Sequence, residues 1–353
     1  MSLHVHEHAR NCIQSDAMSI LFAETSAISR TELHNTKTGI RILSGQVQLT
    51  RVVVDNSSQN CLEIADVSTD FLLKASRFSH CPQAAILATS SGLINIDNVT
   101  INSGSIGVKV DAVQGHLSLR DSRIFAMTSS AMDVNYMDNT NEGNLTVENS
   151  AIYNCSSGIQ YLSNNYHSNT RVRIYNNSLT SIQSNALMIT LTLRHRYYNN
   201  PDLNERKVDV ALNTFDGVCD ILLRTRNNVN LTCYGNTVRN CVCRDSTECL
   251  FAVKSISHAL IANRAYDVSA NIFRNNTGQC LIRMTSLRID SLFYGTFFYN
   301  QLLENDVIDG VVVVESQYIT LSYNRFENPA SEFEIRADSG KCRSLFCNFY
   351  GCR

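Results

Sequence analysis

The sequence predicts an all-β fold, a single-stranded, right-handed parallel β-helix (a solenoid) of about twelve coils. Two observations predict it. One apolar pattern recurs twelve times, at intervals of 23 to 36 residues, and each interval contains short runs that alternate apolar and polar residues. A helical crossover between parallel strands needs about a dozen residues, for which the shortest intervals have no room. Leucine-rich repeats need leucine at more positions than this chain provides.

The recurring pattern predicts the first two strands of each coil. It is an apolar residue, a second one two places on, a small or amide residue five places on, and an apolar residue seven places on. Alternation with period two indicates a half-buried strand, and Asn or Ser at the fifth place suits the corner that follows. The first unit is Leu21/Ala23/Ser26/Ile28 and the last is Ile319/Leu321/Asn324/Phe326.

A third strand is predicted about fifteen residues into each unit, often after a small residue. It is recognised in the segments 61–64, 107–110, 131–134, 158–161 and 186–189. Three strands and three corners then complete one coil.

Asparagine holds the fifth place in the second half of the chain. Stacked coils rise by about 4.8 Å, so that each amide can donate to the next one in a ladder. We interpret this column as structural rather than ligand-binding, because it continues through consecutive coils. Its members are Asn177, Asn213, Asn236, Asn271, Asn300 and Asn324.

Extra residues enter mainly at one corner, after the third strand, in the segments 135–143, 162–170, 190–206, 224–229 and 254–264. Insertions on one face of a repeat rod commonly mark its interaction side. Several are basic and aromatic, which predicts a cationic ledge for an acidic glycan or an acidic protein surface. The alternative is an ordinary solvated loop neutralised by Asp202 and Glu205. The binding candidates are Tyr166, His167, Arg171, Arg194, His195, Arg196, Tyr197, Arg224 and Arg226.

Catalysis on an acidic polysaccharide would need carboxylates on adjacent coils, with a basic residue beside them. The best set is Asp97, Asp121 and Glu148, with Arg120 between them. Solvated acids that stabilise strand edges are the alternative interpretation, and we expect no catalytic site. His80 and His116 look isolated in the sequence, since neither pairs with a carboxylate dyad on the same face.

The 13 cysteines are many for a reducing compartment and favour an oxidising one. Cys219 and Cys241 fall at nearly matching places in successive units, which predicts one disulfide. Cys243 and Cys249 bracket a short insertion and predict a second. No metal-ligand spacing such as Cys-x2-Cys is present, so we expect no metal and no cofactor.

Seven Asn-x-Ser/Thr sequons occur, about as many as chance predicts for this composition. Asn56, Asn154 and Asn275 lie at an outer corner of their units and are the glycosylation candidates. No signal peptide follows Met1. We therefore expect an extracellular segment, or the ectodomain of a membrane protein, whose leader lies outside this sequence.

The charge is nearly balanced, with 30 Lys and Arg against 32 Asp and Glu, which argues against a nucleic-acid partner. No apolar run is long enough to cross a membrane. The partners we expect are an extracellular protein or an acidic glycan. We assign residues 1–338 to the β-helix and residues 339–353 to a Cys-rich tail that could begin another module.

The repeat resembles the pectin-lyase-like class of right-handed β-helices over residues 20–336. The N-x-F-x-N turns, the ending Asn324–Ile335 and the tail Cys347-Asn-Phe-Tyr-Gly351 also resemble blocks of bark-beetle/Anakonda proteins, transmembrane proteins of cell–cell junctions. That resemblance implies a non-enzymatic adhesion or scaffold role. The alternative is a carbohydrate-active β-helix, a lyase or hydrolase that acts on acidic glycan.

Overall fold

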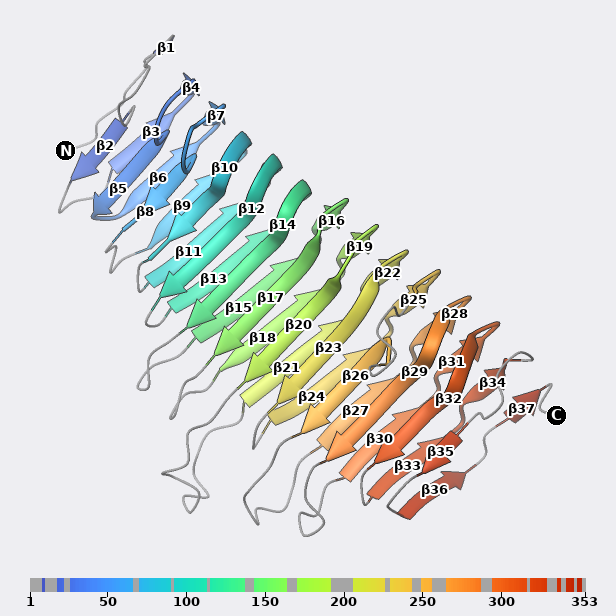
Figure 1. Ribbon diagram of the computed structural model, residues 1–353. Helices are drawn as coiled ribbons and strands as arrows, with labels where there is room; N and C mark the ends of the chain where they lie inside the picture. Colours follow the sequence, from blue (N-terminus) through green and yellow to red (C-terminus); the bar gives the residue numbers. More distant parts are fainter. Residues whose placement is uncertain are drawn as a thin grey trace.

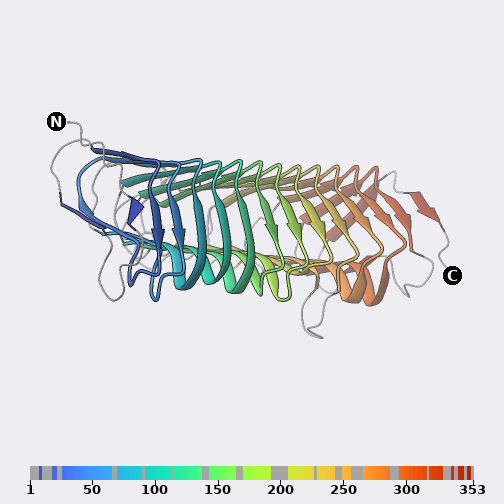
Figure 2. The same cartoon turned by 90° about the horizontal axis from the view of Figure 1, so that it is seen from above.

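The structure is a computed structural model that describes residues 8–9, 18–21, 26–65, 70–89, 92–112, 115–136, 143–163, 170–191, 206–225, 229–242, 249–255, 265–286, 294–315, 318–328, 335–337, 341–345 and 348–350. Every regular element in these ranges is a β-strand, and they contain no helix able to cross a membrane. The strands stack into a straight rod with the two termini at opposite ends (Figures 1 and 2).

The described strands form two parallel sheets that run along the rod. The smaller sheet has 13 strands, which are β3 (Ser26–Ser29), β6 (Val47–Thr50), β9 (Phe71–Lys74), β11 (Gly92–Asp97), β13 (Gly115–Arg120), β15 (Gly143–Glu148), β18 (Arg171–Tyr175), β21 (Arg206–Ala211), β24 (Val229–Tyr234), β27 (Ala265–Ser269), β30 (Tyr294–Phe298), β33 (Tyr318–Ser322) and β36 (Lys341–Leu345).

The larger sheet has 24 strands and wraps around the second corner of the rod. Its strands are β1 (His8–Ala9), β2 (Met18–Leu21), β4 (Glu32–His34), β5 (Ile40–Ser44), β7 (Val53–Asp55), β8 (Leu62–Ile64), β10 (Arg77–Ala88), β12 (Thr100–Ala112), β14 (Arg123–Tyr136), β16 (Ala151–Tyr153), β17 (Ser157–Ser163), β19 (Ser178–Thr180), β20 (Asn185–Leu191), β22 (Thr214–Asp216), β23 (Cys219–Thr225), β25 (Thr237–Arg239), β26 (Phe251–Ser255), β28 (Ile272–Arg274), β29 (Thr277–Ser286), β31 (Gln301–Leu303), β32 (Asp306–Glu315), β34 (Arg325–Glu327), β35 (Ile335–Ala337) and β37 (Asn348–Tyr350).

One coil contains three strand segments, as the sequence predicted. In the coil that begins at Val47 these are β6, β7 and β8, and in the next three coils the second and third segments fuse into the long strands β10, β12 and β14. Each strand pairs in parallel with the equivalent strand one coil away, so Val47 lies opposite Phe71 and Leu49 opposite Leu73. The predicted solenoid is therefore confirmed.

The first predicted unit is wrong in register. The sequence pattern placed Ser26 at the corner and Ile28 at the start of the second strand, but in β3 they pair with Val47 and Leu49 of β6, in the first strand. The first coil of the smaller sheet therefore begins at Ser26, and Thr31 takes its corner position beside Val52. Leu21 and Ala23 show the same spacing of apolar residues five places earlier than Ser26 and Ile28, which explains the misplacement.

Both sheets continue past residue 338. Strand β36 pairs with β33 and β37 pairs with β34, with Phe349 opposite Phe326. The described residues of 339–353 thus extend the same rod.

The core is the stack of inward side chains from successive coils. Leu49, Leu73, Ile96 and Leu119 follow one another up the smaller sheet and are all fully buried. Burial of apolar surface at about 25 cal/mol per Å² drives this stacking, and each coil needs its neighbours to complete the burial.

Two columns of left-handed residues form the corners of the rod. At the first corner Arg51, Ala75, Asn98 and Asp121 have φ between 49° and 56°. At the second corner the column includes Asn56, with φ of 60°. Asn and Asp tolerate this conformation better than other non-glycine residues, which explains their frequency at these places.

Candidate functional site

The six predicted amides form a continuous, buried ladder just after the first corner. Asn177 Nδ2 donates to Asn213 Oδ1 at 3.0 Å, and the pattern repeats through Asn236, Asn271 and Asn300 to Asn324 at 2.9–3.1 Å. Each Oδ1 also accepts from the backbone N–H of the preceding ladder residue, as Asn236 Oδ1 does from Asn213. These amides are saturated by the fold, so they have no capacity left for a ligand.

A second ladder at the next corner was missed by the sequence reasoning. Asn276 Nδ2 donates to Asn305 Oδ1 at 2.8 Å, and Asn305 donates to Asn328 at 2.8 Å. All three side chains are buried. The signal was present, because the predicted N-x-apolar-x-N turns end one residue before Asn276 and on Asn328 itself.

The three acidic candidates are not assembled into a catalytic group. Asp97 lies opposite Arg120, and Arg120 lies opposite Glu148, so a cation separates the two carboxylates. Glu148 forms ion pairs with Arg120 at 3.3 Å and with Arg173 at 3.0 Å. Asp97 forms an ion pair with Lys74 at 3.8 Å. Asp121 belongs to the left-handed corner column rather than to this strand face.

Most of the predicted cationic ledge lies outside the described residues. This applies to Tyr166, His167, Arg194, His195, Arg196, Tyr197 and Arg226. Of the others, Arg224 has a described backbone in β23. Arg171 is exposed on the smaller sheet, where it lies opposite Lys207.

The predicted disulfides are both wrong. Cys241 is buried, and the pairing of Asp216 with Arg239 places Val218, and not Cys219, opposite it. Cys243 lies outside the described residues, and its predicted partner Cys249 is bonded to another cysteine.

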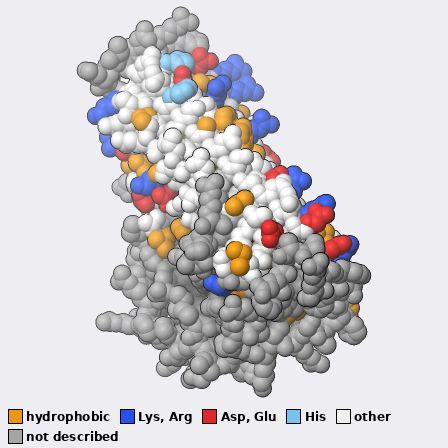
Figure 3. Space-filling view, turned by 45° about the vertical axis from the view of Figure 1, so that its right-hand side comes forward, with side chains coloured by type: hydrophobic (Ala, Val, Ile, Leu, Met, Phe, Trp, Pro, Cys, Tyr) orange, Lys and Arg blue, Asp and Glu red, His pale blue; other side chains and the backbone are white. Residues whose placement is uncertain are grey.

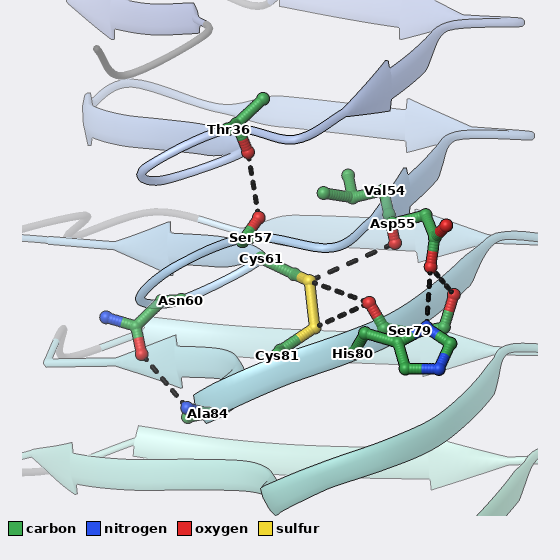
Figure 4. Close-up of a disulfide and its surroundings, with 10 residues drawn as sticks. All are labelled: Thr36, Val54, Asp55, Ser57, Asn60, Cys61, Ser79, His80, Cys81 and Ala84. Atoms are coloured by element: carbon green, nitrogen blue, oxygen red, sulfur yellow. Dashed lines mark hydrogen bonds and ion pairs between the residues drawn. A yellow bond between two sulfur atoms is a disulfide. The ribbon is translucent and has the colours of Figure 1, made fainter. Parts of the chain in front are cut away.

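The two disulfides of the described residues are Cys249–Cys280 and Cys61–Cys81. Cys249 and Cys280 are stacked one coil apart, since Leu250 N donates to Cys280 O. Cys61 and Cys81 cross the interior of the second corner (Figure 4). All four cysteines are buried.

The three sequon candidates occupy the same left-handed corner column and are exposed. Asn56 Nδ2 donates to Asn35 at 2.5 Å, and Asn275 Nδ2 donates to Asn240 at 2.7 Å. The side chain of Asn154 forms no hydrogen bond within the described part of the chain.

A histidine–aspartate cluster beside this corner was missed. Asp55 Oδ1 lies 2.9 Å from His80 Nδ1 and accepts from Ser79 Oγ at 2.7 Å (Figure 4). His34 Nδ1 lies 3.8 Å from Asp55 Oδ2. The sequence suggested that His80 is isolated, and this expectation is wrong. The signal was the coil spacing, since β10 stacks Ser79 directly on Asp55 and places His80 next to both.

The cluster holds Asp55 in its charged form. Partial burial raises the pKa of the Asp55 carboxyl group, but the hydrogen bonds from His80 and Ser79 and the charges of His80 and His34 outweigh burial. The net pKa of Asp55 is lowered from its ordinary value. No group of three or more His, Cys, Asp or Glu in the described ranges is arranged to hold a metal ion.

Two shallow hollows lie along the second corner. One has a volume of about 680 Å³, adjoins the histidine–aspartate cluster and is lined by Asn35, Thr36, Lys37, Asn56, Ser58, Gln59 and Gln83. The other has a volume of about 470 Å³ and is lined by Asn154, Ser181, Ile182, Gln183, Gly217, Val218, Asn240 and Val242. The linings contain carboxamides and hydroxyls, and Lys37 is the only charged residue among the described residues that line either hollow.

A family model described as "Right handed beta helix region" matches residues 38–200. No curated protein and no solved structure matches the chain. The chain is a right-handed parallel β-helix repeat protein. The match and the stacked sheets establish this architecture, which many activities share, so function must be argued from the sites of this β-helix.

Proposed function

We propose that this β-helix is an extracellular structural or adhesion segment of a larger cell-surface or secreted protein, which presents its loop-bearing edge to a protein or glycan partner. The observation that carries the proposal is the charge pattern on the smaller sheet. Lys74, Asp97, Arg120, Glu148 and Arg173 alternate in charge along the stack. Ion pairs of 3.0–3.8 Å join Lys74 to Asp97 and join both Arg120 and Arg173 to Glu148. This arrangement stabilises a rod and pairs two of the three predicted acidic residues, Asp97 and Glu148, with cations rather than with each other.

The buried disulfides support an oxidising location, since such bonds persist outside reducing compartments. The exposed corner sequons Asn56 and Asn275 are compatible with a glycoprotein. The resemblance of the turns to bark-beetle/Anakonda blocks is the reason for proposing a junction or adhesion role.

The test measures binding and turnover separately. The protein is incubated with polygalacturonate or a sulfated glycan, with and without calcium. We expect no cleavage, and we expect any binding to weaken in the double variant Arg194→Ala/Arg196→Ala. Cleavage that is abolished by Asp121→Ala would overturn the proposal.

One observation favours the alternative, a carbohydrate-active enzyme. Asp55 holds His80 beside the larger hollow, and a carboxylate-oriented imidazole is a common general base. If turnover of an acidic glycan is found, His80→Ala should abolish it, while His116→Ala on the smaller sheet should not.

A further inference from the structure

The smaller hollow at the second corner exists because two small residues lie between two asparagines in the column of stacked corner residues. Asn154, Ser181, Gly217 and Asn240 stack on one another in four successive coils, as the backbone bonds Asn154 N to Thr180 O, Ser181 N to Asp216 O and Gly217 N to Arg239 O show. The two central members are small, and both ends are asparagine. At a rise of about 4.8 Å per coil, the gap between the end walls spans about 14 Å.

The floor of this hollow is apolar, and its rim is polar. Ile182 and Val218 are buried beneath it, and Val242 is 47% exposed at its edge. No hydrogen bond within the described residues uses the side chains of Asn154, Ser181 or Gln183. They differ in this respect from the saturated ladder amides at the first corner.

One end wall is held in place from outside the hollow. Asn240 Nδ2 donates to Asp216 at 2.8 Å, and Asn275 donates to Asn240 Oδ1 at 2.7 Å. Asp216 is paired with Arg239 at 2.8 Å, so the charges nearest the hollow neutralise each other. Figure 3 shows one face of the rod, on which described charged side chains of both signs follow one edge beside a larger area of uncharged surface.

We infer that this hollow binds a short segment of a neutral saccharide, lying along the rod axis. Carboxamides both donate and accept, which suits ring hydroxyl groups, and the apolar floor suits the C–H face of a sugar ring. Because none of the described lining residues carries a charge, they offer an anionic sugar no cation to compensate the loss of its hydration. The volume of about 470 Å³ falls in the range of small-ligand sites.

A peptide is a poorer match for the same surface. Strand addition needs free backbone groups, but at this corner the N–H groups of Ser181 and Gly217 are bonded to the next coil. This inference rests on the proposed adhesion role and names the class of partner for one edge of the rod.

The experiment uses the full chain carrying Ser156→Ala, which removes the sequon and keeps the Asn154 side chain. Cellotetraose and chitotetraose are the neutral probes, tetragalacturonate is the acidic one, and affinity is measured by calorimetry. Gly217→Asn should fill the hollow, because an added Cβ at Gly217 meets no atom within 4 Å. Asparagine already adopts the same left-handed corner at Asn154 and Asn240, so this variant should fold.

We expect at least one neutral tetrasaccharide to bind, and its affinity to fall at least tenfold in Gly217→Asn and several-fold in Gln183→Ala. Glu304→Asn is the matched control, because Glu304 has φ of 56° at the same corner, does not line the hollow, and its replacement by asparagine creates no sequon. Its affinity should equal that of the Ser156→Ala parent. Failure of both neutral probes to bind, equal affinity in Gly217→Asn, or tighter binding of tetragalacturonate would overturn the inference. None of these results bears on turnover or on Arg194 and Arg196, so the proposed function would be tested separately.

Discussion

Replacement of Asn236 by alanine should cost more stability than any surface change on this rod. Its side chain is 3% exposed and takes part in four hydrogen bonds. Oδ1 accepts from the backbone N–H and the Nδ2 of Asn213, and Nδ2 donates to Val210 O at 2.8 Å and to Asn271 Oδ1 at 2.9 Å.

The magnitude follows from which partners are left unsatisfied. The variant loses the bond from Asn213 Nδ2 and the bond to Asn271 Oδ1. Asn213 Nδ2 still donates to Ile174 O, and Asn271 Oδ1 still accepts from the Asn236 backbone N–H, so each lost bond costs only about 1 kcal/mol. The buried N–H of Asn213 loses its partner, which adds about 1–3 kcal/mol. We therefore expect Asn236→Ala to lower the free energy of unfolding by about 3–5 kcal/mol.

Serine should recover part of this loss. Ser122 Oγ occupies the equivalent place in its coil and accepts from Val99 N at 3.0 Å. Asn236→Ser keeps that acceptor and should cost about 2 kcal/mol, while exposed Gln301→Ala should change stability by less than about 0.5 kcal/mol.

Urea unfolding, followed by hydrogen exchange at the Asn213 amide, measures these differences globally and locally. Hydrogen exchange is included because a repeat rod need not unfold in one step. A cost for Asn236→Ala within 1 kcal/mol of Gln301→Ala would refute the reasoning that the ladder stabilises the fold.

Three further predictions concern disulfides, pH and thiols. Non-reducing peptide mapping should find Cys249 linked to Cys280, and removing this bond, whose ends are 31 residues apart, should cost about 3–4 kcal/mol; a Cys243–Cys249 peptide would contradict the structure. The lowered pKa of Asp55 stabilises the fold above the unfolded-state value of 3.8, and this contribution is lost as pH falls through the folded-state pKa. Asp55→Asn should therefore flatten the fall of the thermal midpoint below pH 4, and an unchanged profile would count against the cluster. Burial raises the pKa of the Cys233 thiol, so a thiol reagent should label Cys233 only after unfolding; labelling in the native protein would show that the core at Cys233 is open.

The architecture was readable from the sequence because every coil faces the same requirement. Positions such as Val47 and Leu49 must be apolar to fill the interior, and the requirement returns each time the chain completes a turn. The asparagine column followed from the same logic, since equivalent residues lie one rise apart.

Cysteine pairing was not readable, because it depends on register to a single residue. Cys219 and Cys241 differ by one place within their units, and a shift of one residue along a strand reverses the face a side chain occupies. Cys61 and Cys81 occupy unlike places in their coils and meet only because the chain bends around the second corner. Cys249 was hidden by the insertion that precedes it, although it lies two residues before Phe251, just as Cys280 lies two residues before Ile282, the residue that pairs with Phe251.

The distribution of the ladder suggests why the loops lie where they do. In the first half of the rod the ladder position is held by valine or serine, and the hydroxyls of Ser76 and Ser122 each accept a hydrogen bond from the backbone N–H of the valine one coil before them. In the second half the amides from Asn177 to Asn324 form an unbroken chain of bonds. Four of the five insertions lie at or beyond residue 162. Long insertions raise the entropic cost of closing a coil, so the coils that carry them need the extra bonds, and a uniform ladder offsets that cost where the rod displays its loops.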